Sequence, residues 1–251
     1  MSTLNKSFQI KNVSFELEDK TILQDISLTL ADQKIYALIG ASGAGKTTLL
    51  QLLGGLKEPT KGTLTYAEKS PKDVVISLVP QEYGLLPWQT ARQTVLAGRK
   101  ISQKQRLTQD DQLAVRQLFE QMQLTDVADK YPNQLSGGQK QRVAITRGLA
   151  SHSELLLMDE PFSALDAFTR ETAQQLFLDS WHQAPRLTVF VTHDIEEALL
   201  LAHEVIVLAP NPGRIKHKMT SPFQEKEHLA GERQSELLFQ TTQVLRKEIE
   251  G

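Results

Sequence analysis

The pattern of apolar and polar positions predicts short strands within the first 80 residues and again from about residue 154 to 208, with a helical stretch between these two groups. Strands are predicted at residues 8–13, 26–30, 34–39, 74–79, 154–158, 187–191 and 205–208. The last three runs are largely apolar, which is typical of parallel strands covered on both faces. Pro80 ends the strand before it, because proline cannot continue a hydrogen-bonded ladder. This order of elements indicates an α/β fold.

The stretch from about residue 89 to 130 has a different composition and is rich in glutamine, lysine and aspartate. Its apolar residues are spaced as one face of a helix; they are Leu113, Val115, Leu118, Phe119, Met122 and Leu124. A small helical insert is therefore expected within the α/β core. Beyond Gly213 the chain is polar, and a last helix is expected near 233–249. Its partial apolar stripe consists of Leu237, Leu238, Val244, Leu245 and Ile249.

Length and composition limit the architecture and the class of partner. With 251 residues, 40% hydrophobic and 23% charged, the chain suits one large domain, or one domain with an inserted subdomain. A net charge of −2 gives no reason to expect a nucleic-acid partner. The absence of cysteine excludes disulfides and thiolate metal sites. The first residues do not resemble a signal peptide and no apolar run reaches about 18 residues, so any membrane role is expected through another subunit.

The run at 34–39 leads into a glycine-rich loop that opens a helix, and this loop matches the phosphate-binding pattern GxxxxGK[ST]. Glycines let the backbone curl so that successive N–H groups point at one anion, and the helix start adds its positive end. Lys46 is expected to reach the outer phosphates, and the Thr47 hydroxyl to hold Mg²⁺. The predicted nucleotide-binding residues are Gly40, Ala41, Ser42, Gly43, Ala44, Gly45, Lys46, Thr47 and Thr48. The chain is therefore predicted to bind a nucleoside triphosphate.

Two acids, Asp159 and Glu160, follow the apolar run 155–158. Ligands sit at the carboxyl ends of parallel strands, so both acids are expected beside the phosphate loop. Asp159 suits a Mg²⁺ partner, directly or through water, and Glu160 suits the polarisation of an attacking water. Acids after an apolar strand are common in any fold, and it is the phosphate loop that favours the catalytic interpretation.

The string Leu-Ser-Gly-Gly-Gln at residues 135–139 is a further candidate anion site. Ser136 and Gln139 are spaced as a capping box at a helix start. Gly137 and Gly138 leave backbone amides uncovered, which suits an anion. A helix cap without any ligand is an equal alternative on local physics alone.

Taken in order, these motifs resemble the ATP-binding cassette (ABC) ATPases. LSGGQ at 135–139 lies between the phosphate loop and LLLMDEP at 155–161. Gln81 follows a strand as in the family's Q-loop, Asp166 lies in a stretch similar to the D-loop, and His193 resembles the switch histidine. The resemblance runs from residue 8 to residue 215 and covers most of the chain.

The resemblance implies a nucleotide site shared between two chains. In this family two cassettes pair head to tail, with ATP between the phosphate loop of one and the LSGGQ segment of the other. The segment is then expected to bind the γ-phosphate of the nucleotide held by the partner. Ser136, Gly137 and Gly138 are expected to make this contact, and Gln139 and Asp166 are also expected among the nucleotide-binding residues.

The resemblance also implies ATP and Mg²⁺ as cofactors and a set of catalytic residues. His193 is expected to hold the γ-phosphate and to help orient Glu160. Gln81 is expected to sense Mg²⁺ and the attacking water. With Lys46 these side chains form the expected catalytic set, and Thr47, Gln81 and Asp159 form the expected metal set.

One position departs from the family pattern. The adenine usually stacks on an aromatic residue ahead of the phosphate loop, and Leu17 stands in its place. Phe15 lies two residues earlier and hence on the same face of a regular strand. Weaker stacking on Leu17 and substitution by Phe15 are both open, and Phe15 as a core residue is the alternative to the second.

The stretch after Gln81 indicates which kind of cassette this is. Leu85, Leu86 and Trp88 lie in a predicted surface loop with polar flanks, which is typical of a partner socket; side chains tucked into the loop are the alternative. This segment, with 192–198 and 211–215, is similar to importers of the nitrate/sulfonate/taurine group, which includes carriers of thiamine-pyrimidine precursors. In such systems the loop receives a coupling helix of the membrane permease.

The expected fold is an α/β P-loop NTPase of the ABC type, with a mixed sheet core, an N-terminal antiparallel β subdomain and an inserted helical subdomain. The ATP-binding core is assigned to residues 1–88 and 146–215, the helical subdomain with the signature motif to 89–145, and a tail helix to 216–251. The resemblance implies a homodimer of cassettes, held peripherally on the cytoplasmic face of the cell membrane by two permease subunits. A separate binding protein is expected to deliver a small anion, a sulfonate or a pyrimidine-precursor-type solute. An exporter subunit, a soluble non-transport ABC ATPase and a non-hydrolysing nucleotide sensor are the alternatives.

Overall fold

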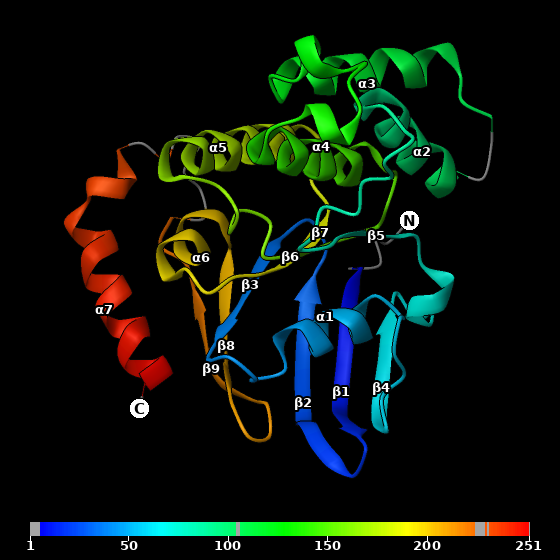
Figure 1. Ribbon diagram of the computed structural model, residues 1–251. Coiled ribbons are helices and arrows are strands. Elements are labelled where there is room, and N and C mark those ends of the chain that lie inside the picture. The colour runs from blue at the N-terminus through cyan, green and yellow to red at the C-terminus, as the bar shows by residue number, and fades with distance from the viewer. Residues whose placement is uncertain (1–5, 104–105, 224–228, 230, 251) are drawn as a thin grey trace, which may run out of the picture. The chain divides into compact units, whose positions relative to one another are not determined.

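The computed structural model describes residues 6–103, 106–223, 229 and 231–250 (Figure 1). The chain divides into two compact units. Unit 1 consists of Met1–Val74 and Arg186–Gly251, and unit 2 consists of Val75–Pro185. Each unit contains residues that the sequence predicts to bind or hydrolyse a nucleotide.

Unit 1 begins with a three-stranded antiparallel sheet in the order β2–β1–β4, coloured blue to cyan in Figure 1. Its strands are β1 (Ser7–Leu17), β2 (Lys20–Ala31) and β4 (Lys61–Tyr66). The turn between β1 and β2 consists of Glu18 and Asp19, whose φ angles are 48° and 62°. Positive φ at both central residues produces a tight turn that matches the twist of the paired strands.

The second group of strands in unit 1 is mixed and carries the phosphate loop. β3 lies between β7 and β8 and is parallel to both, and β9 is antiparallel to β8. Their bounds are β3 (Ile35–Gly40), β7 (Leu187–Val191), β8 (Glu204–Ala209) and β9 (Arg214–Thr220). Every residue of β7 is buried, as expected for a parallel strand covered on both faces.

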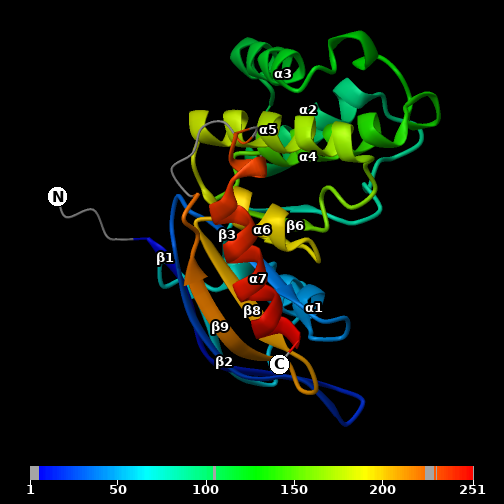
Figure 2. The same cartoon turned by 90° about the vertical axis from the view of Figure 1, so that its left-hand side faces the viewer.

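Three helices of unit 1 pack on these strands. They are α1 (Lys46–Leu53), α6 (Ile195–Leu201) and α7 (Glu236–Glu250). α1 contacts β3 and β7, α6 contacts β3 and β8, and α7 lies against α6 and β8 (Figure 2). Short 3₁₀ turns occur at Pro71–Asp73 and Glu232–Gln234.

Unit 2 joins two parallel strands to a group of helices. The strands are β5 (Ile76–Val79) and β6 (Leu155–Asp159), paired so that Val79 lies opposite Met158. The helices are α2 (Ala91–Gln103), α3 (Gln109–Gln121), α4 (Gly137–Ala150) and α5 (Ala167–Gln183), with 3₁₀ turns at Thr125–Val127 and Pro132–Gln134. α4 is the central element, because it contacts α2, α3, α5 and β5.

The predicted strands are all present, but β1 and β2 are longer than predicted and two strands were not expected. β1 is irregular in register between Ile10 and Glu16, and these β-bulges hide the period-two alternation on which the prediction depends. β9 is an edge strand whose side chains are exposed or half-buried and include lysine and histidine, so no apolar run marks it. β4 begins with the polar residues Lys61, Gly62 and Thr63 for a similar reason.

The predicted helical faces are correct in part. Val115 and Phe119 of α3 are buried, but Leu113 is 53% exposed and does not belong to the face. On α7 Leu238 and Leu245 are buried and Leu237 and Val244 are exposed, so its apolar stripe is narrower than expected.

Helices α7 and α4 do not begin and end where the predicted boundaries lie. α7 begins at Glu236 rather than near 233, because the Ser235 hydroxyl accepts a hydrogen bond from the Leu238 amide and caps the helix there. α4 continues to Ala150, so the proposed limit of the helical subdomain at residue 145 falls inside a helix. The assignment of the subdomains themselves stays a prediction.

Candidate active site

The predicted phosphate loop of unit 1 has the geometry of a strand–loop–helix turn. β3 ends at Gly40 and α1 begins at Lys46, and the loop between them is largely exposed. Gly43 and Gly45 have φ angles of 78° and 85°, a region that favours glycine. The first turn of α1 contains no acidic residue. This arrangement presents backbone amides and a positive helix end to an anion.

Lys46 and Thr47, the two polar side chains that the sequence assigned to the phosphates and their metal ion, lie at the start of α1. The Lys46 ammonium donates hydrogen bonds to the carbonyl oxygens of Gly40 and Ala41, at 2.8 and 3.0 Å, and so lies over the loop. Thr47 is exposed at the start of α1. The end of the loop therefore carries a cation and a hydroxyl group, which belong to Lys46 and Thr47.

Packing against the neighbouring strands requires glycine at both ends of the loop. A Cβ on Gly40 would lie 2.3 Å from the carbonyl oxygen of Leu208, and one on Gly45 would lie 2.6 Å from the Leu23 side chain. Gly213, in the turn between β8 and β9, packs closely against the loop, since a Cβ there would lie 2.3 Å from the Ala44 carbonyl oxygen. The sequence pattern gave no indication of this packing role for Gly213, which was considered only as part of the segment 211–215.

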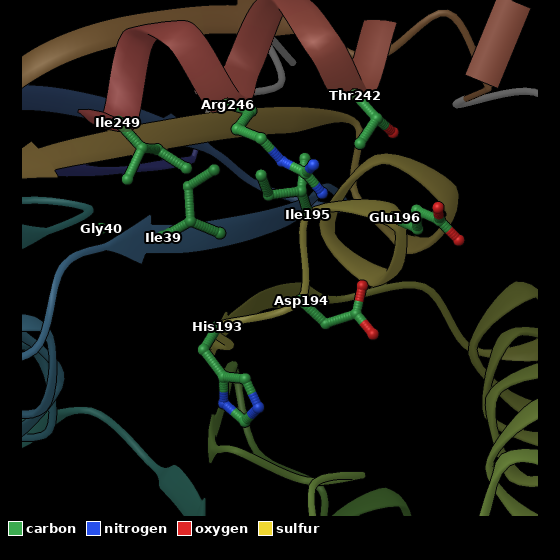
Figure 3. Close-up of a pocket in the computed structure, with 9 residues that line it drawn as sticks. All are labelled: Ile39, Gly40, His193, Asp194, Ile195, Glu196, Thr242, Arg246 and Ile249. Atoms are coloured by element: carbon green, nitrogen blue, oxygen red, sulfur yellow. The ribbon is translucent and has the colours of Figure 1, made fainter. Parts of the chain in front are cut away.

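His193 lies in unit 1 near the start of the same loop. It is exposed between β7 and α6, and with Gly40 it lines a pocket of about 540 Å³ to which α7 contributes Thr242, Arg246 and Ile249 (Figure 3). Figure 3 shows its imidazole pointing away from α7. Two caps hold the backbone around it: Thr192 Oγ1 accepts from the Asp194 amide at 3.0 Å, and the Asp194 carboxylate accepts from the Glu197 amide at 3.1 Å.

Unit 2 brings Gln81 and Glu160 together. Both residues come two positions after a paired couple, Val79 on β5 and Met158 on β6. Because parallel strands end at the same edge, the side chains meet, and Gln81 Nε2 lies 3.5 Å from Glu160 Oε2. The two residues lie far apart in the sequence, and the sheet alone explains their approach.

Glu160 has an unusual backbone. Its φ angle is 48°, in the left-handed region that residues other than glycine rarely adopt. The Ser163 amide and hydroxyl donate to its carbonyl oxygen, at 3.3 and 3.1 Å, and these bonds support the turn. Backbone strain of this kind is concentrated at functional sites, and Glu160 directly follows Asp159, the last residue of β6.

The predicted capping box at 136–139 is present. The Ser136 hydroxyl accepts from the Gln139 amide at 3.2 Å, and the Gln139 side chain accepts from the Ser136 amide at 2.9 Å. The two glycines differ in their surroundings. A Cβ on Gly138 would lie 2.8 Å from Thr169, whereas the nearest atom to one on Gly137 is the Tyr83 hydroxyl at 3.8 Å. Packing therefore explains Gly138 but not Gly137.

Asp166 caps the next helix, α5. Its carboxylate accepts a hydrogen bond from the Thr169 amide at 3.1 Å. Hydrogen bonds from the Thr169 side chain and backbone hold the pKa of the Asp166 carboxyl below its usual value. The Asp166 side chain is exposed.

The two candidates for the adenine contact differ in exposure. Phe15 is 8% exposed, and the Lys57 ammonium covers its ring at 5.0 Å from the centroid, whereas Leu17 is 50% exposed. A register shift between Phe15 and Glu16 breaks the alternation of β1, so the two side chains do not share an exposed face as a regular strand would have them.

The loop after Gln81 exposes apolar side chains, as predicted. Leu86 is 42% exposed and Trp88 is 69% exposed, while Leu85 is half-buried. Among the described residues, no helix is long and apolar enough to span a bilayer, and no cluster of three or more His, Asp or Glu side chains forms a metal cage. A Mg²⁺ ion that is shared with nucleotide phosphates needs only one or two protein oxygens and no such cage.

Comparison with known proteins is consistent with this geometry. The family described as ABC transporter matches residues 23–163. The chain belongs to the ABC transporter family. It is 41% identical to the taurine import ATP-binding protein TauB of Pseudomonas fluorescens over 84% of this chain and 80% of that protein. The protein of the same name from Escherichia coli O157:H7 is 37% identical over 89% of this chain and 88% of its own length.

A solved structure confirms the predicted fold of this ABC transporter family member. It is a dimeric ATP-binding cassette in a post-hydrolysis state, bound to ADP and Pi. It matches with a TM-score of 0.73 and 27% identity, over 85% of this chain and 98% of that one. The α/β cassette fold with an antiparallel N-terminal sheet and a mixed sheet is therefore as predicted, and this ABC ATPase has the fold of an ATP-hydrolysing protein.

The role of Gly213 as a support for the phosphate loop leads to a test. In Gly213→Ala the added methyl group collides with the Ala44 carbonyl and displaces the loop, so we expect about a tenfold weaker affinity for ATP with a modest loss of thermal stability. Titration with a fluorescent ATP analogue measures it. Gly231→Ala is the control, because nothing lies within 4 Å of a Cβ there. Equal affinities of the two variants would show that the contact does not shape the loop.

Proposed function

We propose that this chain is the ATP-hydrolysing subunit of an importer for a small sulfonate or a related anion. The observation that carries the proposal is the pair of Gln81 and Glu160 at 3.5 Å, at the carboxyl ends of two strands, in a chain that also has a phosphate loop. That combination suits hydrolysis of a bound triphosphate rather than binding alone. The similarity to taurine import proteins favours import over export and over non-transport work.

The residues of unit 1 are proposed to bind the nucleotide. Residues 40–48 receive the phosphates, and Lys46 exchanges the carbonyls of Gly40 and Ala41 for phosphate oxygens. Leu17 contacts the adenine through its exposed side chain, in preference to the buried Phe15. His193 holds the γ-phosphate. These roles agree with the exposure of Thr47, Leu17 and His193.

The residues of unit 2 are proposed to carry out hydrolysis and to complete a second nucleotide site. Glu160 polarises the attacking water, and Gln81 donates toward Glu160 and keeps its carboxylate in place. Ser136, Gly137, Gly138 and Gln139, with Asp166, contact the nucleotide of a second copy of the chain. The exposed Gly137 supports this proposal. Packing does not explain why this position is glycine, and the absence of a side chain leaves room for a ligand.

Mg²⁺ fits the donors that the chain offers. The Thr47 hydroxyl and the Asp159 carboxylate are hard oxygen ligands, with Gln81 as a third candidate, and Mg²⁺ prefers such ligands together with phosphate oxygens. When bound, the ion neutralises charge on the phosphates.

The remaining partners are proposed from the family and the exposed loop. Two cassettes lie on the cytoplasmic face of the membrane against two permease subunits, and a separate binding protein supplies the solute. Leu86 and Trp88 form the contact with the permease, since exposed apolar side chains with polar neighbours suit a protein partner.

The hydrolytic role of Glu160 is tested by Glu160→Gln. The amide cannot accept a proton from water, so we expect kcat for ATP hydrolysis to fall by about a hundredfold or more while ATP binding is retained. A phosphate-release assay and a nucleotide titration measure the two quantities. Glu120→Gln, an exposed change on α3, is the control. Normal turnover in Glu160→Gln would refute the assignment and leave a nucleotide sensor as the better reading.

Gly137→Ala separates the two explanations of the 136–139 segment. Alanine is a better helix former and meets no close neighbour, so a plain cap predicts unchanged or slightly higher stability and normal activity. The proposed contact with a partner's nucleotide predicts a loss of kcat by about tenfold or more with stability kept. Gln109→Ala makes the matching change at the first position of α3. Thermal unfolding and the phosphate-release assay decide between the two explanations.

Trp88→Ala tests the permease contact. We expect normal ATP binding by the purified chain and at least about a tenfold loss of labelled taurine or sulfonate uptake in cells that carry only the variant. Ile101→Ala, at an exposed apolar residue on α2, serves as the matched control. Uptake equal to that of the unmodified chain would show that Trp88 is not part of the contact.

A further inference from the structure

A cation on α4 holds the backbone of the loop after Gln81. The Arg147 guanidinium donates to the carbonyl oxygen of Gly84 at 2.5 Å and, through its other terminal nitrogen, to that of Tyr83 at 3.1 Å. Burial lowers the pKa of Arg147, but arginine keeps its charge at any physiological pH. The group is half-buried, so the two carbonyl dipoles compensate the loss of water around a charge.

The surrounding residues make room for this contact. A Cβ on Gly98 of α2 would lie 2.7 Å from Arg147 Cγ, so the arginine stem passes over a glycine in mid-helix. Tyr83 and Gly84 have φ angles of 61° and 58°, and this left-handed pair turns both carbonyl groups toward one side. A strained backbone of this kind persists where its surroundings hold it in place.

α4 links this contact to the rest of unit 2. The helix starts at the Ser136 cap, and the Tyr83 hydroxyl lies 3.8 Å from the Cβ position of Gly137. At its other end, Gly148 lets the helix approach the strands, because a Cβ there would lie 2.9 Å from both Leu156 and Val79. The same loop therefore comes near the first turn of α4 at Tyr83 and is hydrogen-bonded to the last turn by Arg147.

We propose that Arg147 is a positioning residue that makes the loop from Gln81 to Trp88 and helix α4 move as one body. It acts through the loop backbone, on Gln81 at one end and Trp88 at the other. Any displacement of Trp88 by a partner then moves the amides at Ser136 and Gly137. The proposal rests on the ATPase function above and assigns the path between the partner surface and the nucleotide contact.

Two substitutions on the same helix test the proposal. Arg147→Met removes the donors and keeps most of the stem. Arg142→Met is the matched control, because Arg142 also lies on α4 and donates to two backbone carbonyls, those of Met122 and Gln123 at 3.0 and 3.3 Å. We expect Arg147→Met to lower kcat for ATP hydrolysis about tenfold with KM for ATP within about twofold, and Arg142→Met to lower kcat less than about threefold.

Two readouts separate positioning from loss of stability. In a Gln81→Ala background, Arg147→Met should lower kcat by less than about twofold, because both changes act through the same side chain. Hydrogen exchange should rise in residues 81–88 for Arg147→Met and not for Arg142→Met, measured at a temperature where both are folded. Arg147→Lys, with one reachable carbonyl in place of two, should give intermediate values.

Equal loss of kcat in the two methionine variants, or effects of Arg147→Met and Gln81→Ala that multiply, would overturn the proposal. Unchanged exchange in residues 81–88 would also overturn it. The exchange experiment needs no catalysis, so it still decides the role of Arg147 if the unmodified chain hydrolyses no ATP and the proposed function itself fails.

Discussion

The close approach of Gly40 to the backbone of β8 governs the geometry of the phosphate loop. β3 lies parallel to β8 with Gly40 opposite Leu208, and a side chain at this point would meet the Leu208 carbonyl at 2.3 Å. The chain can therefore leave the strand and curl at once into a loop of exposed amides. Gly45 and Gly213 continue the same constraint, since Leu23 and the Ala44 carbonyl occupy the space where their side chains would be. The shape of the loop therefore depends on close packing of its glycines against backbone carbonyls and the Leu23 side chain.

In unit 2 the fold brings together polar side chains that lie far apart in the sequence. The paired ends of β5 and β6 bring Gln81 to Glu160, whose backbone has a left-handed φ angle of 48°. α4 packs on these strands at Gly148, holds the following loop through Arg147 and begins at the Ser136 cap. Its position at the centre of the unit makes it the element through which a change at the exposed Trp88 can reach the exposed glycine at 137.

Local patterns predicted much of this correctly. The apolar runs marked the parallel strands, and the spacing of Ser136 and Gln139 predicted a capping box that is present. The motifs, in order, indicated the ABC family, which the comparisons bear out. The exposed loop at Leu86 and Trp88 was also expected. These features depend on short-range rules: period, cap geometry and the chemistry of a glycine-rich turn.

Other features were wrong or missed because neighbours far apart in sequence decide them. The bulges of β1 separate Phe15 from Leu17, and the polar edge strand β9 has no apolar pattern to reveal it. Gly213 and Arg147 look unremarkable in the sequence, and their importance comes from what they face: the Ala44 carbonyl in one case and the carbonyls of Tyr83 and Gly84 in the other.

Residue types and their spacing within one turn are enough to specify which groups of this protein can hold phosphates, polarise water and cap helices. The tertiary fold determines which glycines packing requires and which have no close neighbour. It also decided which arginine holds the loop, because steric exclusion and hydrogen-bond geometry act between residues that only folding brings together.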